Sequence, residues 1–483
     1  MKRIKYLLLT LIVSGFVFAQ NENWFYATID TPNAETLMAA HPDKVQLIHS
    51  HNGISAVYLE SEAALSLKDY GNLHGPGYIF RENENDALAA LTKSYDFTQR
   101  IFDFDISEDV FVNQCIAMVD EENIGNTILD MEAYGTRYHS KAPGVQASID
   151  LKDRWSDMAV AAGRADISVV NYDHDFTGQK SVILTIPGSE NPDEIVIIGG
   201  HLDSGDFWIQ DNAPGADDNG SGIAVLTETL RVLLTNEFYP KKTVQIMGYA
   251  AEEIGLLGSA DIAETYSADN KDVLAVLQFD MTNYNGSSYD IALISDPDYT
   301  SSILNLYLID LMEHYNASGE HQITYGATNC GYACSDHVSW TENGYLAAFP
   351  FEAAFGQYNP FIHSPNDTFA MMNNDASHSV KFVKLALEFV IETAKTTMMG
   401  TQELNAGELA VTVKNRQLIY QFSGGNSPLN SVTVLDASAR KLIFKDQLQA
   451  NGVIALNGLS SGVYIAVFKS DNGKVFTKKF LVR

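Results

Sequence analysis

Cysteine, long apolar runs and positive charge are all scarce in this sequence of 483 residues. The 31 Lys and Arg face 61 Asp and Glu, and the formal net charge of -30 argues against a nucleic-acid partner. After Gln20 no apolar run approaches the roughly 20 residues of a membrane-spanning helix, so we expect no membrane span. The acidity suits a protein that works outside the cell, although a merely soluble acidic enzyme fits it equally well.

The 3 cysteines leave one close pair and one odd thiol. Cys330 and Cys334 stand four apart in a tight Gly-containing loop, Cys-Gly-Tyr-Ala-Cys. In an exported chain such a pair favours a disulfide over a pair of zinc ligands. Cys115 lies in the helix-like stretch 110–119, where a small buried hydrophobe is expected.

The amino terminus has the pattern of a secretory signal. Lys2, Arg3 and Lys5 precede a short apolar run over 7–17, and a cleavage point is expected after Ala19. Residues 1–19 are therefore predicted to be a signal peptide. The protein is expected to be secreted, outside the cell or at its surface after export through the periplasm.

Residues 20–107 are predicted to form a small α+β unit. Short strands are expected at 24–29, 45–48 and 54–59, with helix-like stretches between them. The unit carries no cluster of ligand-type residues. We expect either a propeptide that assists folding or blocks the functional site, or a permanent accessory domain.

Residues 108–400 alternate apolar strands with amphipathic helices, and several strands are almost continuously apolar. Such strands are buried on both faces, which predicts an α/β unit with a mostly parallel, mixed sheet covered by helices on both sides. The expected strands are 181–186, 194–198, 243–249, 273–279, 290–294 and 345–349, and the expected helices are 147–162, 222–235, 301–315 and 377–398.

Residues 401–483 differ from the rest of the chain in composition and in their pattern of apolar residues. From 404 onward, 10 Lys and Arg face 4 Asp and Glu, and short strands follow one another between Gly and Ser turns. This predicts a small all-β domain without a catalytic role, joined by a polar linker at 401–407.

Residues 199–222, GGHLDSGDFWIQDNAPGADDNGSG, are crowded with His and Asp. Because an apolar strand ends there, His201 and Asp203 should emerge at the carboxyl end of a buried strand, where open α/β sheets bind ligands. A loop this acidic repels itself unless a cation or solvent lies among the charges. We therefore expect a metal site.

Other ligand-type residues also follow apolar strands or precede the last helix. The adjacent pair Glu252 and Glu253 point to opposite sides of extended chain, so one can bind metal while the other handles a proton. Asp280 follows another strand, and His363 lies near the end of the unit. Two imidazoles and three carboxylates suit two zinc-like ions better than one.

These motifs resemble the M28 family of zinc aminopeptidases, and among them the bacterial leucyl aminopeptidases. The matching segments are Gly-Gly-His201-Leu-Asp203-Ser, Gly215-Ala-Asp-Asp218-Asn-Gly-Ser-Gly, Ala-Ala-Glu252-Glu253-Ile-Gly, Gln-Phe-Asp280-Met-Thr-Asn-Tyr, Ile-His363-Ser-Pro-Asn-Asp-Thr and Cys330-Gly-Tyr332-Ala-Cys334-Ser-Asp-His. The resemblance covers about 290 residues, and the segments occur in the family's order.

The resemblance implies two Zn²⁺ per chain and a role for each motif residue. Asp218, with Asp217 as the alternative in register, would bridge the ions. His201 and Asp280 would complete one site, and Glu253 and His363 the other. Glu252 would be the general base and acid, Asp203 would orient His201, and Tyr332 would donate to the developing oxyanion, unless it merely packs in its loop.

The resemblance also implies a pocket for an apolar first residue of a peptide, preferably leucine. Its walls would be Phe351, Phe355, Tyr358 and Ile362, although an aromatic run beside a strand is otherwise typical of core. The expected function is therefore a secreted di-zinc leucyl aminopeptidase acting on peptides. A glutaminyl cyclase or carboxypeptidase of the same fold and a non-catalytic surface adhesin are the alternatives, and Glu252 beside a full ligand set argues against the adhesin.

The carboxyl-terminal domain resembles the sorting domains of type IX secretion in Bacteroidota. Gly462-Val-Tyr-Ile and the basic Lys478-Lys479-Phe480 near the terminus carry this likeness. It implies contact with a secretion machinery. The alternative is an accessory β-sandwich that binds substrate or a surface.

Overall fold

The computed structural model describes residues 24–67, 74–93, 105–205, 210–396, 409–414, 416–422, 429–435, 441–460, 462–470 and 475–482. The predicted signal peptide and the linker at 401–407 lie outside these ranges. None of the described helices has the length and apolar character needed to cross a membrane.

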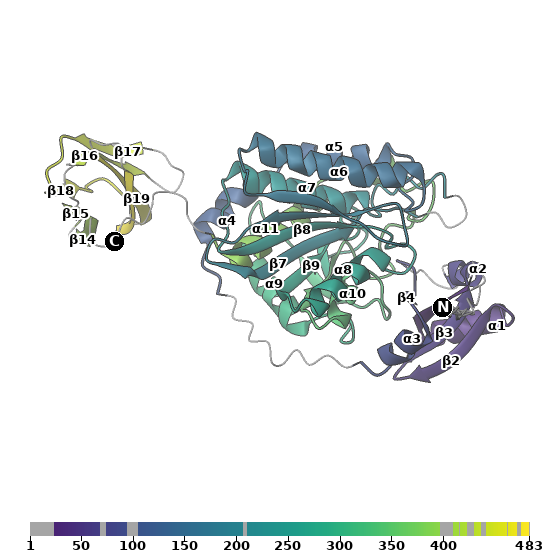
Figure 1. Ribbon diagram of the computed structural model, residues 1–483. Coiled ribbons are helices and arrows are strands. Elements are labelled where there is room, and N and C mark those ends of the chain that lie inside the picture. The colour runs from purple at the N-terminus through teal and green to yellow at the C-terminus, as the bar shows by residue number, and fades with distance from the viewer. Residues whose placement is uncertain are drawn as a thin grey trace, which may run out of the picture.

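The amino-terminal unit, purple in Figure 1, is built around a four-stranded antiparallel sheet. The strand order of this sheet is β2-β3-β1-β4. Its strands are β1 (Trp24–Asp30), β2 (Val45–His51), β3 (Ile54–Glu60) and β4 (Ile79–Arg81), and its helices are α1 (Thr31–Ala40), α2 (Ser61–Leu65) and α3 (Glu84–Ala90). Val57 and Leu59, two apart on β3, bury their side chains against Ala34 and Leu37 of α1. The α+β prediction for this unit is confirmed.

The central sheet has six strands in the order β12-β9-β7-β8-β6-β5. The strands are β5 (Ser168–Tyr172), β6 (Ser181–Ile186), β7 (Asn191–His201), β8 (Lys242–Tyr249), β9 (Asp272–Gln278) and β12 (Ala347–Ala348). β12, β9, β7 and β8 are parallel, whereas β6 and β5 join antiparallel. The prediction of a mostly parallel mixed sheet is confirmed.

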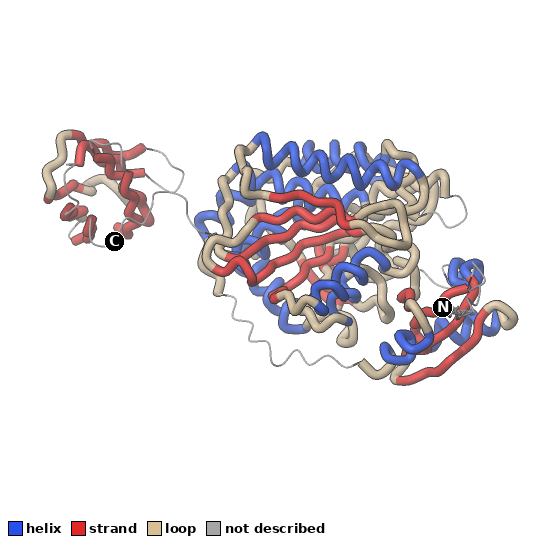
Figure 2. The backbone as a smooth tube through the Cα atoms, in the orientation of Figure 1, coloured by secondary structure: helices blue, strands red, loops and turns tan. Residues whose placement is uncertain are grey.

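Helices cover both faces of this sheet (Figure 2). Val196 and Ile198 of β7 pack on one side with α6 (Ala142–Ala161), α7 (Gly220–Thr235) and α11 (Ser379–Ala394). Ile195 and Ile197 point to the other side, towards α8 (Leu257–Ala268) and α10 (His337–Glu342). This alternation is why β7 reads as a continuous apolar run.

Two of the expected strands differ from the prediction. The stretch 345–349 contributes only β12 to the central sheet, because Pro350 has no N–H to continue a ladder and the chain passes into β13 (Pro350–Phe351). The stretch 290–294 forms β10 (Ile291–Ile294), which lies in a separate small sheet between β11 (Tyr325–Thr328) and β13. The remaining helices of this unit are α4 (Asp109–Ile116), α5 (Glu121–Glu132), α9 (Ser302–Tyr315) and the short 3₁₀ helix η3 (Phe369–Met372).

The described residues of the carboxyl-terminal part are all-β, as expected. Its two sheets have the orders β14-β15-β18 and β17-β16-β19-β20. The strands are β14 (Leu409–Lys414), β15 (Gln417–Phe422), β16 (Leu429–Leu435), β17 (Lys441–Asp446), β18 (Asn451–Ala455), β19 (Gly462–Ser470) and β20 (Val475–Val482). Leu418, Tyr420 and Phe422 alternate inward on β15 and share one core with Val432 and Phe468.

Candidate metal centre

Three neighbouring parallel strands deliver ligand-type residues to one edge of the central sheet. β7 ends at His201, the loop after β8 carries Glu252 and Glu253, and Asp280 follows β9. Asp218 lies just before α7, whose first turn is capped by the Asn219 side chain accepting from the Gly222 N–H. Because parallel strands end at the same edge, residues distant in the sequence meet there.

A close backbone approach explains the glycine before His201. A Cβ at Gly200 would lie 2.5 Å from the Phe279 carbonyl oxygen, so only glycine lets the β7 end and the β9 end run this close. The result is that His201 and Asp280 face one another across a short gap.

The structure brings the five predicted metal ligands together. His201 Nε2 lies 3.1 Å from Asp218 Oδ1 and 3.2 Å from Asp280 Oδ1. His363 Nε2 lies 2.9 Å from Asp218 Oδ2 and 3.3 Å from Glu253 Oε2. Each oxygen of the Asp218 carboxylate thus faces a different imidazole, and the five residues divide into two groups that share Asp218.

All of these ligand-type groups are buried except the half-buried His363, and they shift one another's pKa values. Burial opposes ionisation of Asp218, but the His201 and His363 imidazoles bind it and lower its pKa well below the usual range. Burial likewise opposes charge on His201, but the Asp280 and Glu252 carboxylates raise its pKa well above the usual range. These two shifts favour a charged Asp218 carboxylate beside a protonated His201 imidazole.

The donor set fits divalent metal ions of the zinc type. Asp218, Glu253 and His363 place ligand atoms within 4.8 Å of one another, and so do Asp218 and Asp280 with a third imidazole, that of His74. Buried Asp and Glu oxygens with His nitrogens are the ligands that zinc takes in proteins. A buried cluster with this much negative charge is stabilised when cations lie among the carboxylates.

Asp203 has a larger role than the sequence indicated. Its carboxylate was predicted to orient His201, yet Oδ1 lies 3.5 Å from His201 Nδ1, whereas the Asp203 backbone carbonyl lies 3.1 Å away. The two carboxylate oxygens instead accept the backbone N–H groups of Glu252 at 3.0 Å and Glu253 at 3.2 Å. Asp203 therefore fixes both the His201 ring and the loop that carries the two glutamates.

The Asp218 loop has a similar support, which sequence reasoning missed. Asp367 accepts the N–H groups of Asp217 at 3.1 Å and Asp218 at 3.0 Å. The Asp217 carboxylate accepts the Asn283 N–H and the Asn359 side-chain amide, and so it points away from His201 and His363. Asp367 stands four residues after His363, inside the same Ile-His-Ser-Pro-Asn-Asp-Thr segment.

Glu252 is buried beside the metal-binding residues but makes a different set of contacts. Among the described residues its Oε1 has no hydrogen-bond partner. Burial raises the pKa of its carboxyl well above the usual range; His201 opposes this shift, and Asp336 and Glu253 add to it. A carboxyl group of this kind can exchange a proton with a reacting group close by.

Tyr332 lies in a loop that is fixed at several points. Cys330 and Cys334 form a disulfide, as predicted, and Asp296 accepts the N–H groups of Cys330 at 2.7 Å and Gly331 at 2.9 Å. Burial raises the pKa of Tyr332 well above its usual range, so its hydroxyl stays a donor. Cys115 is a buried free thiol, as expected.

The four predicted pocket residues also come together. Phe351, Phe355, Tyr358 and Ile362 belong to one apolar cluster with Phe349 and Tyr332. The Phe351 and Phe355 ring centroids lie 6.1 Å apart, and those of Phe355 and Tyr358 lie 5.3 Å apart. His74 links this cluster to the metal-binding residues, because its ring centroid lies 5.2 Å from that of Phe351 and its Nε2 lies 3.3 Å from Asp280 Oδ2.

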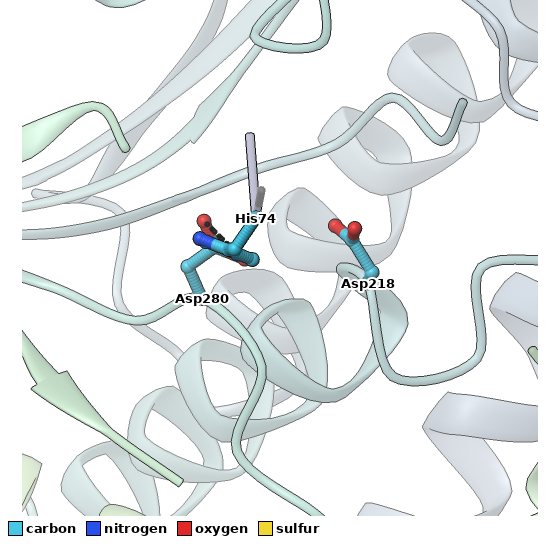
Figure 3. A group of neighbouring side chains, drawn as sticks. All are labelled: His74, Asp218 and Asp280. Carbon is cyan, nitrogen blue, oxygen red and sulfur yellow. Dashed lines mark ion pairs between the residues drawn. The ribbon is translucent and has the colours of Figure 1, made fainter. Parts of the chain in front are cut away.

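His74 is the residue that sequence reasoning missed altogether. It comes from the amino-terminal unit, yet its Nε2 lies 3.3 Å from Asp280 Oδ2 (Figure 3). A lone histidine outside any motif gives no signal in the sequence, and only the folded arrangement brings it to the centre.

Comparison with known proteins agrees with this site. The family model described as "Peptidase family M28" matches residues 181–388, which contain all five predicted metal ligands. A probable aminopeptidase of Saccharomyces cerevisiae is 33% identical over 294 residues, covering 60% of this chain and 77% of that protein. Leucine aminopeptidase 1 of Blastomyces gilchristii is 32% identical over 308 residues, covering 62% of this chain and 78% of that protein.

Solved structures agree as well. LapB of Legionella pneumophila superposes with a TM-score of 0.66 at 26% identity, over 77% of this chain and all of that one. The LapA aminopeptidase of the same organism gives a TM-score of 0.66 at 28% identity, over 77% of this chain and 98% of that one.

Proposed function

The chain belongs to peptidase family M28 and is a metallo-exopeptidase, and on that premise we propose that it is a di-zinc aminopeptidase that releases apolar residues, leucine foremost, from peptides. The observation that carries the proposal is the Asp218 carboxylate, which presents one oxygen to His201 and the other to His363. A carboxylate between two such groups is suited to bridge two ions.

One ion would be held by His201, Asp218 and Asp280, and the other by Asp218, Glu253 and His363. When bound, zinc polarises a substrate carbonyl and lowers the pKa of a water ligand. We infer zinc from the type of ligand atom, because carboxylate oxygens and imidazole nitrogens are ligands that zinc takes in proteins.

The remaining groups act directly on the substrate. Glu252 would take a proton from the attacking water and deliver it to the leaving amine, because it is buried beside the metal ligands with an oxygen unengaged by the described residues. The Tyr332 hydroxyl would donate to the oxygen that becomes negative in the transition state. The rigid loop around Tyr332 keeps this donor in place without reorganisation.

The aromatic cluster supports a preference for apolar first residues. Phe351, Phe355, Tyr358 and Ile362 offer an apolar wall beside the catalytic groups, and burial of a leucine side chain contributes roughly 1.5–3 kcal/mol. The names of the fungal relatives support the same preference, and they favour an aminopeptidase over a glutaminyl cyclase or a carboxypeptidase.

We place the enzyme outside the cell. The pattern of residues 1–19 supports export, and the likeness of residues 401–483 to type IX sorting domains supports contact with a secretion machinery. The mass and amino terminus of the protein recovered from culture medium would test both assignments.

The variant Glu252→Gln tests the catalytic assignment. It keeps the size of the side chain but cannot accept a proton, so we expect zinc content to stay unchanged while Leu-p-nitroanilide hydrolysis falls by roughly 10²–10⁴-fold. The exposed Glu190→Gln is the matched control. Hydrolysis should be measured before and after limited trypsin digestion, with and without a chelator. Unchanged hydrolysis in Glu252→Gln refutes its role as base.

A further inference from the structure

The amino-terminal unit sends a short segment into the metal centre. His74 belongs to the amino-terminal unit and precedes β4. Its side chain is only 1% exposed, because it is buried in the metal centre of the neighbouring α/β unit. Its imidazole lies beside the Asp280 carboxylate, and Asp218 lies near by (Figure 3). Ligand atoms of His74, Asp218 and Asp280 all lie within 4.8 Å of one another.

The His74 ring also contacts the aromatic cluster. Its centroid lies 5.2 Å from that of Phe351 and 6.1 Å from that of Tyr358. These are two of the residues expected to hold the first side chain of a substrate. The histidine therefore lies where the metal-binding residues and the pocket meet.

The backbone of the same segment takes the contact expected of a substrate. The Tyr332 hydroxyl donates to the His74 carbonyl oxygen. In the proposed reaction this hydroxyl serves the carbonyl under attack, so the His74 carbonyl occupies a substrate position. An aminopeptidase needs a free terminal amine next to the bond it cleaves, and the His74–Gly75 bond lies inside the chain.

Gly75 lets the segment lie close to the catalytic groups. Its φ is +70°, and a Cβ there would lie 2.5 Å from the Cys334 carbonyl oxygen and 3.4 Å from Glu252 Oε1. A side chain at this position would clash with the loop of Tyr332. The segment thus fills the space between Glu252 and the disulfide loop.

Contacts outside the centre hold the unit in this position. Arg81 donates through Nη1 and Nη2 to both carboxylate oxygens of Glu342 on α10, at 2.8 and 2.7 Å. The Phe80 N–H donates to the Gly255 carbonyl at 3.3 Å, close to the glutamate loop. Ile79 packs in one apolar cluster with Leu256 and Val338.

We propose that the amino-terminal unit keeps the peptidase latent, with His74 as an additional ligand of the metal that Asp218 and Asp280 bind and with the His74 carbonyl in the place of the scissile carbonyl. The proposal rests on the proposed function, since it concerns the regulation of the same centre. Activation then requires removal or displacement of this segment.

The test uses the full chain loaded with Co²⁺, whose visible absorption reports the ligands around the ion. His74→Ala should change the cobalt spectrum and raise Leu-p-nitroanilide hydrolysis by roughly tenfold or more, which corresponds to about 1.4 kcal/mol of lost inhibitory contact. Free imidazole should restore the spectrum and suppress the gained activity. His49→Ala, an exposed histidine of the same unit, is the matched control and should leave both unchanged.

X-ray absorption of the zinc-loaded wild-type chain supplies a measurement that needs no variant. The measurement gives the number of imidazole ligands bound to zinc per chain. Three imidazoles, from His74, His201 and His363, support the proposal, whereas two, from His201 and His363 alone, overturn it. Identical cobalt spectra for His74→Ala and wild type also overturn it. If the spectrum changes but no form hydrolyses any peptide, even after limited trypsin digestion, His74 stands as a ligand and the proposed function falls.

Discussion

Asp203 links the glutamate loop to the end of β7, and its replacement by asparagine should weaken metal binding. The buried carboxylate accepts the N–H groups of Glu252 at 3.0 Å and Glu253 at 3.2 Å, one on each oxygen. Asparagine offers only one side-chain oxygen, so it can accept only one of these two N–H groups. Its NH₂ group would face the other N–H, and two hydrogen-bond donors repel each other. Glu253 would then lose its fixed direction towards His363.

The size of the effect follows from the bonds that are lost. A hydrogen bond to a charged acceptor contributes about 1.5–3 kcal/mol, and one of the two is replaced by a repulsive contact in Asp203→Asn. If the free energy of zinc binding becomes less favourable by about 2 kcal/mol of this loss, zinc affinity falls roughly 30-fold. Loss of a group that orients metal ligands commonly costs about 10–100-fold in affinity.

Competition with a fluorescent zinc chelator at neutral pH measures this change. Asp211→Asn is the matched control, because Asp211 belongs to the same acidic stretch, its side chain is 80% exposed, and its ion pair with Lys141 lies at the surface. Its zinc affinity should equal that of the wild type. Wild-type zinc affinity in a folded Asp203→Asn would refute the role assigned to this carboxylate.

Two further predictions concern the contact between the amino-terminal unit and the peptidase. Glu342→Gln removes the charge of the carboxylate that accepts from the Arg81 guanidinium. Because both side chains are largely buried, about 2 kcal/mol of docking should be lost, and Leu-p-nitroanilide hydrolysis by the full chain should rise towards that of His74→Ala. Unchanged hydrolysis would show that this ion pair does not hold the unit. Asp30 receives a hydrogen bond from the Tyr299 hydroxyl, and burial, with Asp296 and Asp298 near by, raises its pKa from 3.8 to about 7. The docked state thus favours protonated Asp30, so docking is strongest below pH 3.8 and weakens as the pH rises to about 7. The ratio of wild-type to Asp30→Asn hydrolysis should therefore climb over that interval, and a flat ratio would contradict the assignment.

Periodicity in the sequence was enough to predict the central sheet and its edge. β7 reads as an apolar run because Val196 and Ile198 face one layer of helices and Ile195 and Ile197 the other. Parallel neighbours end at one edge, so the residues after each strand could be grouped in advance, including His201 and Asp280. The prediction failed at 345–349, where Pro350 ends the ladder and the chain enters another sheet.

The residues that support the centre were largely beyond sequence reasoning. Asp203 and Asp367 act by accepting backbone N–H groups of distant loops, and no side-chain pattern records such donors. Asp217 and Asp218 are adjacent and chemically identical, so only the fold separates them, by turning Asp217 towards Asn283 and Asn359. His74 is placed by the docking of one unit on another, which no local pattern encodes.

The most direct test of the account is anomalous diffraction at the zinc edge from crystals of the zinc-loaded full chain. We predict two zinc peaks, one among Asp218, Glu253 and His363 and the other among His201, Asp218 and Asp280, with His74 at the second. A single peak, or peaks that leave Asp218 outside the coordination of either ion, would contradict a two-metal centre bridged by this carboxylate.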